Sequence, residues 1–247
     1  MIFALVILIV LVITGLIWLL DIFILSKKRA TNAKEPILVE YSKSFFPVIL
    51  LVFFIRSFLA EPFKIPSGSM MPTLLAGDFI LVNKFSYGVR LPILNHTMIK
   101  VGKPQRGDVF VFHYPPTPSI EYIKRVVGLP GDVIEYKIKI LFINGKKVEQ
   151  IFVDRYSYVM NQIHNIEAKE LKEVLGDVTH SILIHDLPGD DFKFEVPKDH
   201  YLAFGDNRDN SADSRVWGFV PEHNLVGRAF FIWFNFGEFK RIGTVIH

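Results

Sequence analysis

The sequence predicts a mainly β protein in which two N-terminal transmembrane helices precede an exported antiparallel β domain that carries a small inserted β subdomain. Three observations predict this fold class. Apolar residues are concentrated before residue 61. Most of the remaining chain consists of short alternating or β-branched segments separated by turn residues. Basic residues cluster between the two apolar segments, which by the positive-inside rule places the β domain beyond the membrane.

The first predicted element is a transmembrane helix over residues 1–25. Met1 to Leu25 is almost uninterrupted apolar sequence, broken only by Thr14, Gly15 and Asp21. At about 1.5 Å per residue, such a helix crosses a hydrocarbon core of about 30 Å. A cleaved signal peptide is the alternative, but the segment has no basic n-region, is too long for an h-region and is not followed by a small-x-small site.

The second predicted helix, over residues 44–62, has uncertain ends. The apolar run from Phe45 to Ala60 contains Pro47 and Arg56 and is short for a span, and only Tyr41 to Phe63 reaches spanning length. Arg56 is costly in the middle of a membrane, but it lies in the second half of the run and can extend toward the interface. We therefore expect a structural role for this arginine.

The segment between the helices, residues 26–43, is basic and is predicted to be a cytoplasmic loop. Its positive charge comes from Lys27, Lys28, Arg29, Lys34 and Lys43. Both termini then face outward, and the chain from about residue 61 lies on the outer face of the inner membrane. The net charge of +3 comes mostly from this loop, so nothing indicates nucleic-acid binding. The chain has no cysteine, which leaves its redox compartment undecided.

The exported part divides into a β core over 63–144 and 197–247 and an inserted subdomain over 145–196. We predict strands over 79–82, 109–114, 122–127, 133–143, 178–184, 201–204 and 226–234. Asn144-Gly145 is a hairpin-turn signal. Neither helix nor strand periodicity is clean over 165–177. The run Phe230 to Phe234 is apolar on both faces, which favours a buried strand over a lipid contact.

Two distant segments provide candidate groups for covalent catalysis. Ser67 and Ser69 lie on a proline-flanked turn in which Gly68 permits an unusual dihedral, and Lys124 lies in an apolar run. Serine is a weak nucleophile without a base, and a desolvated lysine can lose its proton and act as one. Strand alternation places Lys124 on one face with Tyr122 and Val126, which lowers its pKa. Ser69 and Lys124 are therefore the candidate nucleophile and base.

A third polar motif runs from Gly205 to Arg215 and contains groups that can satisfy one another and brace a site. Read as a calcium loop beginning at Asp209, it has Ser214 in place of the required glycine and Val220 in place of the required glutamate. The chain also has no His-Glu-x-x-His motif, so a zinc peptidase has little support. A Ser-His-Asp triad stays open, because the sequence offers His113, His200 and His223.

Together the three motifs resemble the sequence boxes of bacterial type I signal peptidase (leader peptidase), with the likeness running from about Pro47 to the C-terminus apart from one divergent block. The stretches concerned are Ile65–Thr73, Tyr122–Asp132 and Gly205–Arg215. The resemblance implies a membrane endopeptidase that removes signal peptides from exported preproteins after small-x-small sequences, by a Ser/Lys dyad and an acyl-enzyme. It implies no metal and no cofactor. It also implies a β core interrupted by a variable β region, which is short in this chain.

The resemblance further assigns roles to individual residues. Ser69 is the nucleophile, Lys124 the general base, and the Ser67 hydroxyl with the Ser69 N–H forms the oxyanion hole. Ser211 orients Lys124 through a hydrogen bond, while Asp213 and Arg215 support the local structure. The resemblance also implies two apolar substrate pockets. The first is surrounded by Ile65, Pro66, Met70, Leu74 and Tyr122. The second is surrounded by Phe63, Ile80, Val111 and Ile123.

Two other functional classes remain as alternatives. A self-cleaving repressor also uses serine and lysine on a β scaffold, but the two spans and the missing helix-turn-helix argue against it. A membrane-anchored β module that binds a partner without catalysis is the other alternative. That module would leave Ser69 unreactive toward a serine-directed acylating inhibitor.

Overall fold

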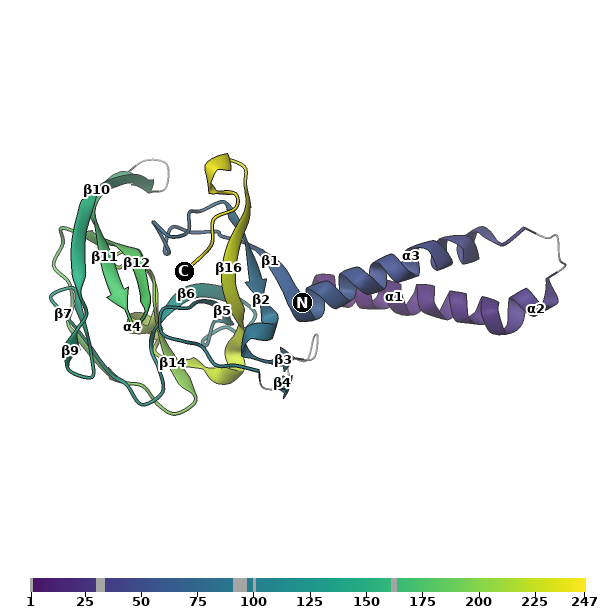
Figure 1. Cartoon of the computed structure of the whole chain (residues 1–247), viewed down its shortest axis with the longest axis horizontal. Coiled ribbons are helices and arrows are strands. Elements are labelled where there is room, and N and C mark those ends of the chain that lie inside the picture. The colour runs from purple at the N-terminus through teal and green to yellow at the C-terminus, as the bar shows by residue number, and fades with distance from the viewer. Residues whose placement is uncertain (1, 30–33, 91–96, 100, 161–163) are drawn as a thin grey trace.

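Two apolar helices form a hairpin that projects from a β domain (Figure 1). The computed structural model describes residues 2–29, 34–90, 97–99, 101–160 and 164–247. The first helix consists of α1 (Ile2–Leu20), a π-helical segment η1 (Asp21–Leu25) and the short α2 (Ser26–Lys28), and the second of α3 (Ile37–Phe54) and the π-helical η2 (Ile55–Leu59). Both helices are long and apolar enough to cross a membrane.

The second helix is displaced from the predicted range 44–62 at both ends. It begins at Ile37 because Pro36 precedes it, accepts hydrogen bonds from Val39 N (2.9 Å) and Glu40 N (3.1 Å), and has a fixed φ that suits a helix start. It ends at Leu59 because the following residues, Ala60–Lys64, form strand β1.

Close packing joins the two helices, and charged residues lie near their ends. A Cβ atom at Gly15 would lie 2.8 Å from the Phe46 ring, so this glycine lets the helices approach. Trp18 also packs on Phe46, with 5.3 Å between ring centroids. Arg56, expected to reach the interface, forms an ion pair with Glu61 of β1 (3.0 Å) at the junction with the β domain.

The main sheet has seven strands in the order β1-β2-β16-β5-β6-β14-β15, with antiparallel neighbours. Its strands are β1 (Ala60–Lys64), β2 (Asp78–Asn83), β5 (Val109–His113), β6 (Glu121–Gly128), β14 (His200–Phe204), β15 (Val220–Pro221) and β16 (Leu225–Asn235). The predicted buried strand at Phe230 to Phe234 belongs to β16, but it is only partly buried, and two register shifts interrupt its alternation. Ile232 is fully buried, whereas Phe230 and Trp233 are 37% and 41% exposed.

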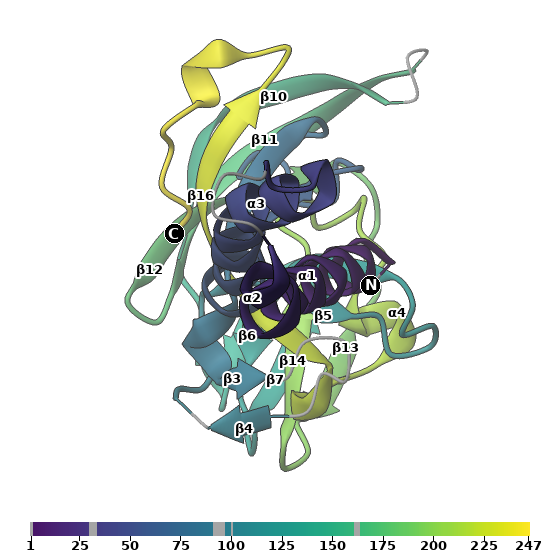
Figure 2. The ribbon, with the colours of Figure 1, turned by 90° about the vertical axis from the view of Figure 1, so that its right-hand side faces the viewer.

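The remaining strands form three smaller sheets. They are β3 (Val89–Arg90) with β4 (Thr97–Ile99), β10 (Gln150–Met160) with β11 (His164–Leu175) and β12 (Val178–His185), and β13 (Phe192–Glu195) with β7 (Val133–Lys137), β8 (Ile140–Ile143) and β9 (Lys146–Lys147). Short helices complete the fold: η3 (Lys84–Tyr87), α4 (Ser214–Trp217), η4 (Glu222–Asn224) and η5 (Phe239–Arg241). Figure 2 shows the helical hairpin end-on, with β10, β11 and β12 on one side of it and β3 and β4 on another.

Three predictions made from the sequence for residues 133–177 had different outcomes. The single strand predicted over 133–143 is a hairpin, because Ile138 and Lys139 take positive φ values of 48° and 62° and reverse the chain. The Asn144-Gly145 turn is confirmed, with φ values of 51° and 78° between β8 and β9. The ambiguous block 165–177 forms most of β11.

The inserted segment is not separate from the β core. Strand β13, within 145–196, pairs with β7 from the first part of the core, so a sheet crosses the predicted boundary at 145. Leu183 of β12 also forms a parallel bridge with Asn207 of the third motif. The insertion therefore lies directly against the segment expected to brace the site.

Candidate active site

The turn that carries both serines is anchored by the core on each side. Ile65, Met70 and Leu74 are buried in the hydrophobic cluster beneath the main sheet. Ser67 is exposed and Ser69 is half-buried between these anchors. The unusual dihedral expected at Gly68 is absent, since its φ is not positive. Glycine fits there because a Cβ atom would lie 2.8 Å from the Met71 sulfur.

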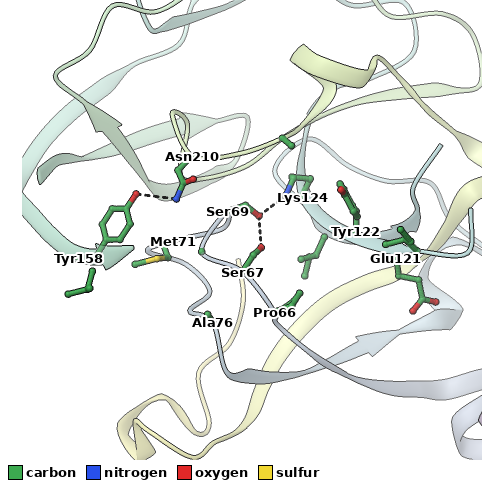
Figure 3. Close-up of a pocket in the computed structure, with 15 residues that line it drawn as sticks. Pro66, Ser67, Ser69, Met71, Ala76, Glu121, Tyr122, Lys124, Tyr158 and Asn210 are labelled. Carbon is green, nitrogen blue, oxygen red and sulfur yellow. Dashed lines mark hydrogen bonds between the residues drawn. The ribbon is translucent and has the colours of Figure 1, made fainter. Parts of the chain in front are cut away.

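Strand β6 brings Lys124 to this turn from 55 residues away along the chain. Lys124 Nζ lies 2.6 Å from Ser69 Oγ (Figure 3). The side chain is 4% exposed, and Nζ lies 5.5 Å from the centre of the Tyr122 ring, on the face that alternation predicts. A nucleophile and a base within hydrogen-bond reach are the geometry that covalent catalysis requires.

The environment of Lys124 shifts its pKa from its ordinary value to about 8. Burial is the largest cause, because a low-dielectric surrounding disfavours the ammonium form. The negative charges of Asp213 and Asp206 oppose this effect, and the positive charge of Arg215 adds to it. A substantial fraction of this amine is therefore neutral near pH 8 and able to accept a proton.

Two groups beside Ser69 can stabilise an oxyanion. The Ser67 hydroxyl lies 3.4 Å from Ser69 Oγ, on the exposed side of the turn. The Ser69 N–H donates no hydrogen bond to any part of the chain that the structure describes. Both donors are thus available to a negative oxygen that develops next to the nucleophile.

The third motif packs directly against the serine turn. Asn207 donates from its backbone N to Ser69 O (3.1 Å) and from Nδ2 to Gly68 O (3.1 Å). A Cβ atom at Gly205 would lie 2.5 Å from Ser69 O and 2.2 Å from Ser211 Oγ. Only glycine fits at such a close approach. Asn207 Nδ2 therefore holds the Gly68–Ser69 peptide group that carries the Ser69 N–H, while Asn207 N and Gly205 hold the Ser69–Met70 peptide group that follows it.

Asp213 and Arg215 hydrogen-bond to each other within the third motif, and their supporting role stays a prediction. The Asp213 carboxylate accepts hydrogen bonds from Gly205 N (2.9 Å) and Arg215 Nε (2.8 Å). Ser211 differs from the expectation, because no hydrogen bond joins it to Lys124. Its hydroxyl is buried against Gly205 and has no hydrogen-bond partner among the described residues.

The buried pair Arg125–Asp206 was missed by the sequence analysis. Arg125 follows the candidate base in β6, and its Nε and Nη2 donate to the Asp206 carboxylate at 2.8 Å and 2.7 Å. Both residues are completely buried, so the pair joins β6 to the third motif. An arginine in an apolar strand requires a buried acid, and that signal could have directed attention to the aspartates of the third motif.

A cleft of about 720 Å³ contains the candidate dyad. Of the residues that the resemblance assigns to the substrate pockets, Pro66, Tyr122 and Ile123 line this cleft. Ile65, Met70, Leu74, Ile80 and Val111 are instead buried in the cluster behind the turn, with Phe63 packed against it. Their contact with a substrate stays a prediction.

Several lining residues were not predicted, namely Met71, Ala76, Ile120, Glu121, Tyr158, Val159, Asn210 and Ala212. None of the described residues that line the cleft is a histidine, so His113, His200 and His223 lie outside it. No group of three His, Asp or Glu residues within the described ranges could hold a metal ion.

Comparison with known proteins gives one consistent family. The family described as "Signal peptidase, peptidase S26" matches residues 38–234. A signal peptidase I from Pseudomonas fluorescens is 49% identical, with 86% of this chain and 81% of that protein covered. The enzyme of the same description from Pseudomonas aeruginosa is 47% identical over the same shares. One from Buchnera aphidicola subsp. Schizaphis graminum is 41% identical, with 94% and 95% covered.

Proposed function

Because this chain belongs to the bacterial signal peptidase I family of membrane-anchored serine peptidases, which remove signal peptides, we propose that Ser69 and Lys124 form its catalytic dyad. One observation carries the assignment. Lys124 Nζ lies 2.6 Å from Ser69 Oγ, and burial lowers the pKa of this lysine to about 8. A serine beside an amine that is partly neutral near pH 8 can be deprotonated as it attacks.

The reaction divides into acylation and deacylation. Ser69 Oγ attacks the scissile carbonyl carbon while Lys124 Nζ takes the hydroxyl proton. The carbonyl oxygen becomes an oxyanion, which accepts hydrogen bonds from the Ser67 hydroxyl and the Ser69 N–H. Lys124 then gives its proton to the departing amine as the peptide bond breaks. Water, activated by the same lysine, hydrolyses the acyl-enzyme and releases the signal peptide.

The substrate is proposed to bind as an added strand. Strand β6 pairs with β5 over Glu121–Arg125 but with β14 only from Arg125 onward, so one backbone edge of Tyr122–Lys124 has no strand partner among the described residues. These residues also line the cleft. An extended peptide can form hydrogen bonds to such an edge and place alternate side chains in pockets. The apolar side chains of Pro66 and Ile123 in the cleft lining suit the small apolar residues before the cut.

The charge distribution supports an orientation in the membrane. By the positive-inside rule, the basic residues between the two helices favour a cytoplasmic location for that loop, with the β domain on the outer face of the inner membrane. This arrangement holds the dyad near the surface where the apolar segment of a preprotein emerges. Tethering raises the local concentration of a substrate held in the same membrane.

The defining experiment incubates the full chain in lipid with a preprotein and maps the new N-terminus. Wild type should cut after a small-x-small sequence, and neither Ser69→Ala nor Lys124→Ala should cut at all. A double variant should be no worse than either single variant, because members of one catalytic unit act non-additively. Activity in Lys124→Ala that disappears on replacing a histidine would assign the chemistry to a Ser-His pair instead.

A further inference from the structure

The cleft continues past Ser69 on the side opposite the proposed signal-peptide pockets. Figure 3 shows Tyr122, Glu121 and Pro66 on one side of the dyad, and Tyr158 and Asn210 on the other. Tyr158 and its neighbour Val159 belong to strand β10 of the inserted segment. The insertion therefore supplies one wall of the reaction cleft.

The direction of the reaction determines which part of a substrate reaches this wall. The acyl portion stays on Ser69, with its small side chains beside Tyr122, while the amine portion leaves. An extended peptide advances about 3.3 Å per residue in a nearly straight line. A chain that lies along β6 up to the scissile bond thus continues toward Tyr158 and Val159 after it.

Hydrogen bonds hold the Tyr158 side chain in place. Its hydroxyl oxygen lies 3.1 Å from Asn207 Nδ2, 3.3 Å from Asn210 Nδ2 and 3.1 Å from His185 Nε2. Amide nitrogens only donate, so the oxygen accepts both of these bonds and its own proton points to His185. Burial lowers the pKa of His185, which favours the neutral ring that this bond requires.

The same asparagine connects this tyrosine to the catalytic turn. Asn207 Nδ2 donates to Gly68 O as well as to Tyr158. The ring of Tyr158 is therefore placed at a fixed position relative to the Gly68–Ser69 peptide. Val159, which follows it, is 59% exposed and projects an apolar side chain at the cleft.

From these contacts we infer that the hairpin β10–β11 is the specificity wall for the residues that follow the scissile bond, with Tyr158 and Val159 in contact with them. The inference rests on the proposed function. The wall around this end of the cleft is formed by Tyr158, Val159, Met71 and Asn210, none of which carries a charge. It suits a mature N-terminus whose first residues are uncharged.

A charge placed in this wall should change the preference for mature residues. The test uses full-length Val159→Lys in lipid and preproteins that carry Asp or Lys at one of the first three mature positions. Attraction and repulsion of partly exposed charges each change rates by a factor of a few. At one position or more, the ratio of kcat/KM for the Asp substrate to that for the Lys substrate should rise about tenfold over wild type.

Two controls separate this effect from a general disturbance. Tyr156→Ala changes a tyrosine of the same strand that does not line the cleft, and the ratio should stay at the wild-type value. Moving the Asp/Lys pair to the signal-peptide side of the cut should likewise remove the effect of Val159→Lys.

Tyr158→Ala should reduce discrimination between bulky and small mature residues more than it reduces cleavage of the small-residue substrate.

The results that would contradict this inference differ from those that would contradict the proposed function. If wild type cleaves the preproteins but Val159→Lys shows the wild-type ratio at all three mature positions, the inference is wrong. If Tyr158→Ala lowered kcat/KM equally for every substrate, Tyr158 would have only a structural role, and the inference would again be contradicted. Failure of wild type to cut after small-x-small sequences would overturn the proposed function itself.

Discussion

The protonation state of one buried amine should control the reaction at the residue scale. Lys124 must be neutral to act as a base, and its pKa is lowered to about 8, mainly by burial. We therefore expect kcat/KM to rise about tenfold per pH unit below pH 8 and to level off above it. The measurement is a pH–rate profile under conditions in which chemistry is rate-limiting. A profile that stays flat from pH 5 to pH 10 in the folded protein would exclude Lys124 as the base.

The hydroxyl of Ser67 should contribute to the transition state rather than to substrate binding. It lies 3.4 Å from Ser69 Oγ, and the developing oxyanion needs donors that are already in place. Ser67→Ala should lower kcat by about 10²- to 10³-fold with little change in KM, the loss expected for one oxyanion donor. Steady-state kinetics distinguish the two roles, since a raised KM with normal kcat would instead assign Ser67 to substrate binding.

Close packing at Gly205 should make this position intolerant of any side chain. A methyl group there would lie 2.5 Å from the backbone oxygen of Ser69, which cannot move without displacing the nucleophile. Gly205→Ala should therefore remove most of the activity while the membrane helices still insert. Gly237→Ala is the matched control, because a Cβ atom there meets no atom closer than 3.5 Å. Normal cleavage by Gly205→Ala would show that the third motif does not fix the serine turn.

At the scale of elements, a buried ion pair joins the insertion to the third motif. Arg208 Nη1 donates to Glu173 Oε1 of β11 at 2.9 Å, and both side chains are at most 1% exposed. Glu173→Gln leaves a buried guanidinium without its acid, and breaking such a pair costs about 3–5 kcal/mol of unfolding free energy. Denaturant unfolding of the variant measures this loss.

Lys169→Met provides the comparison for this ion pair. It removes the exposed partner of Asp186 from the same strand β11 and should change stability little. Equal effects of Glu173→Gln and Lys169→Met would mean that the buried pair does not hold the insertion in place.

Comparison of individual strands shows which sequence patterns were sufficient to predict a strand. Strands with clean alternation or apolar runs, such as 109–114 and 122–127, appear within a residue of their predicted bounds. The hairpin at Ile138 and Lys139 was not predicted, because neither residue is a turn former and their positive φ follows from the pairing of β7 with β8. Strand β11 was ambiguous because its charged residues pair across the sheet and with the third motif instead of alternating cleanly.

At the scale of the whole molecule, the site is assembled from three segments. The sequence identified each of them, but it did not predict how they contact one another. Residue chemistry made Ser69 and Lys124 candidates, since each needs the other to act, and the resemblance of the three motifs gave them their roles. The roles of Asn207 and Tyr158 depend on contacts between the insertion and the serine turn, which no spacing in the sequence encodes. Ser211 illustrates the reverse case, because a residue named from the motif lacks the hydrogen bond expected of it.

The orientation of the whole chain in the membrane gives the last prediction. The chain has no cysteine, so a single introduced cysteine reports the location of its own segment. Lys34→Cys marks the loop between the helices and leaves four basic residues there, and Lys146→Cys marks an exposed position in β9 away from the cleft. Because basic loops stay in the cytoplasm, a membrane-impermeant maleimide added to spheroplasts should label position 146 and spare position 34.

Permeabilising the membrane supplies the control, since both cysteines should then react to the same extent. Preserved activity in each variant confirms that the labelled protein is the folded enzyme. Labelling of position 34 but not of position 146 in intact spheroplasts would place the dyad in the cytoplasm. There it would lie on the wrong side of the membrane to meet a preprotein whose cleavage site has already crossed, so the topology and the proposed substrate are tested together.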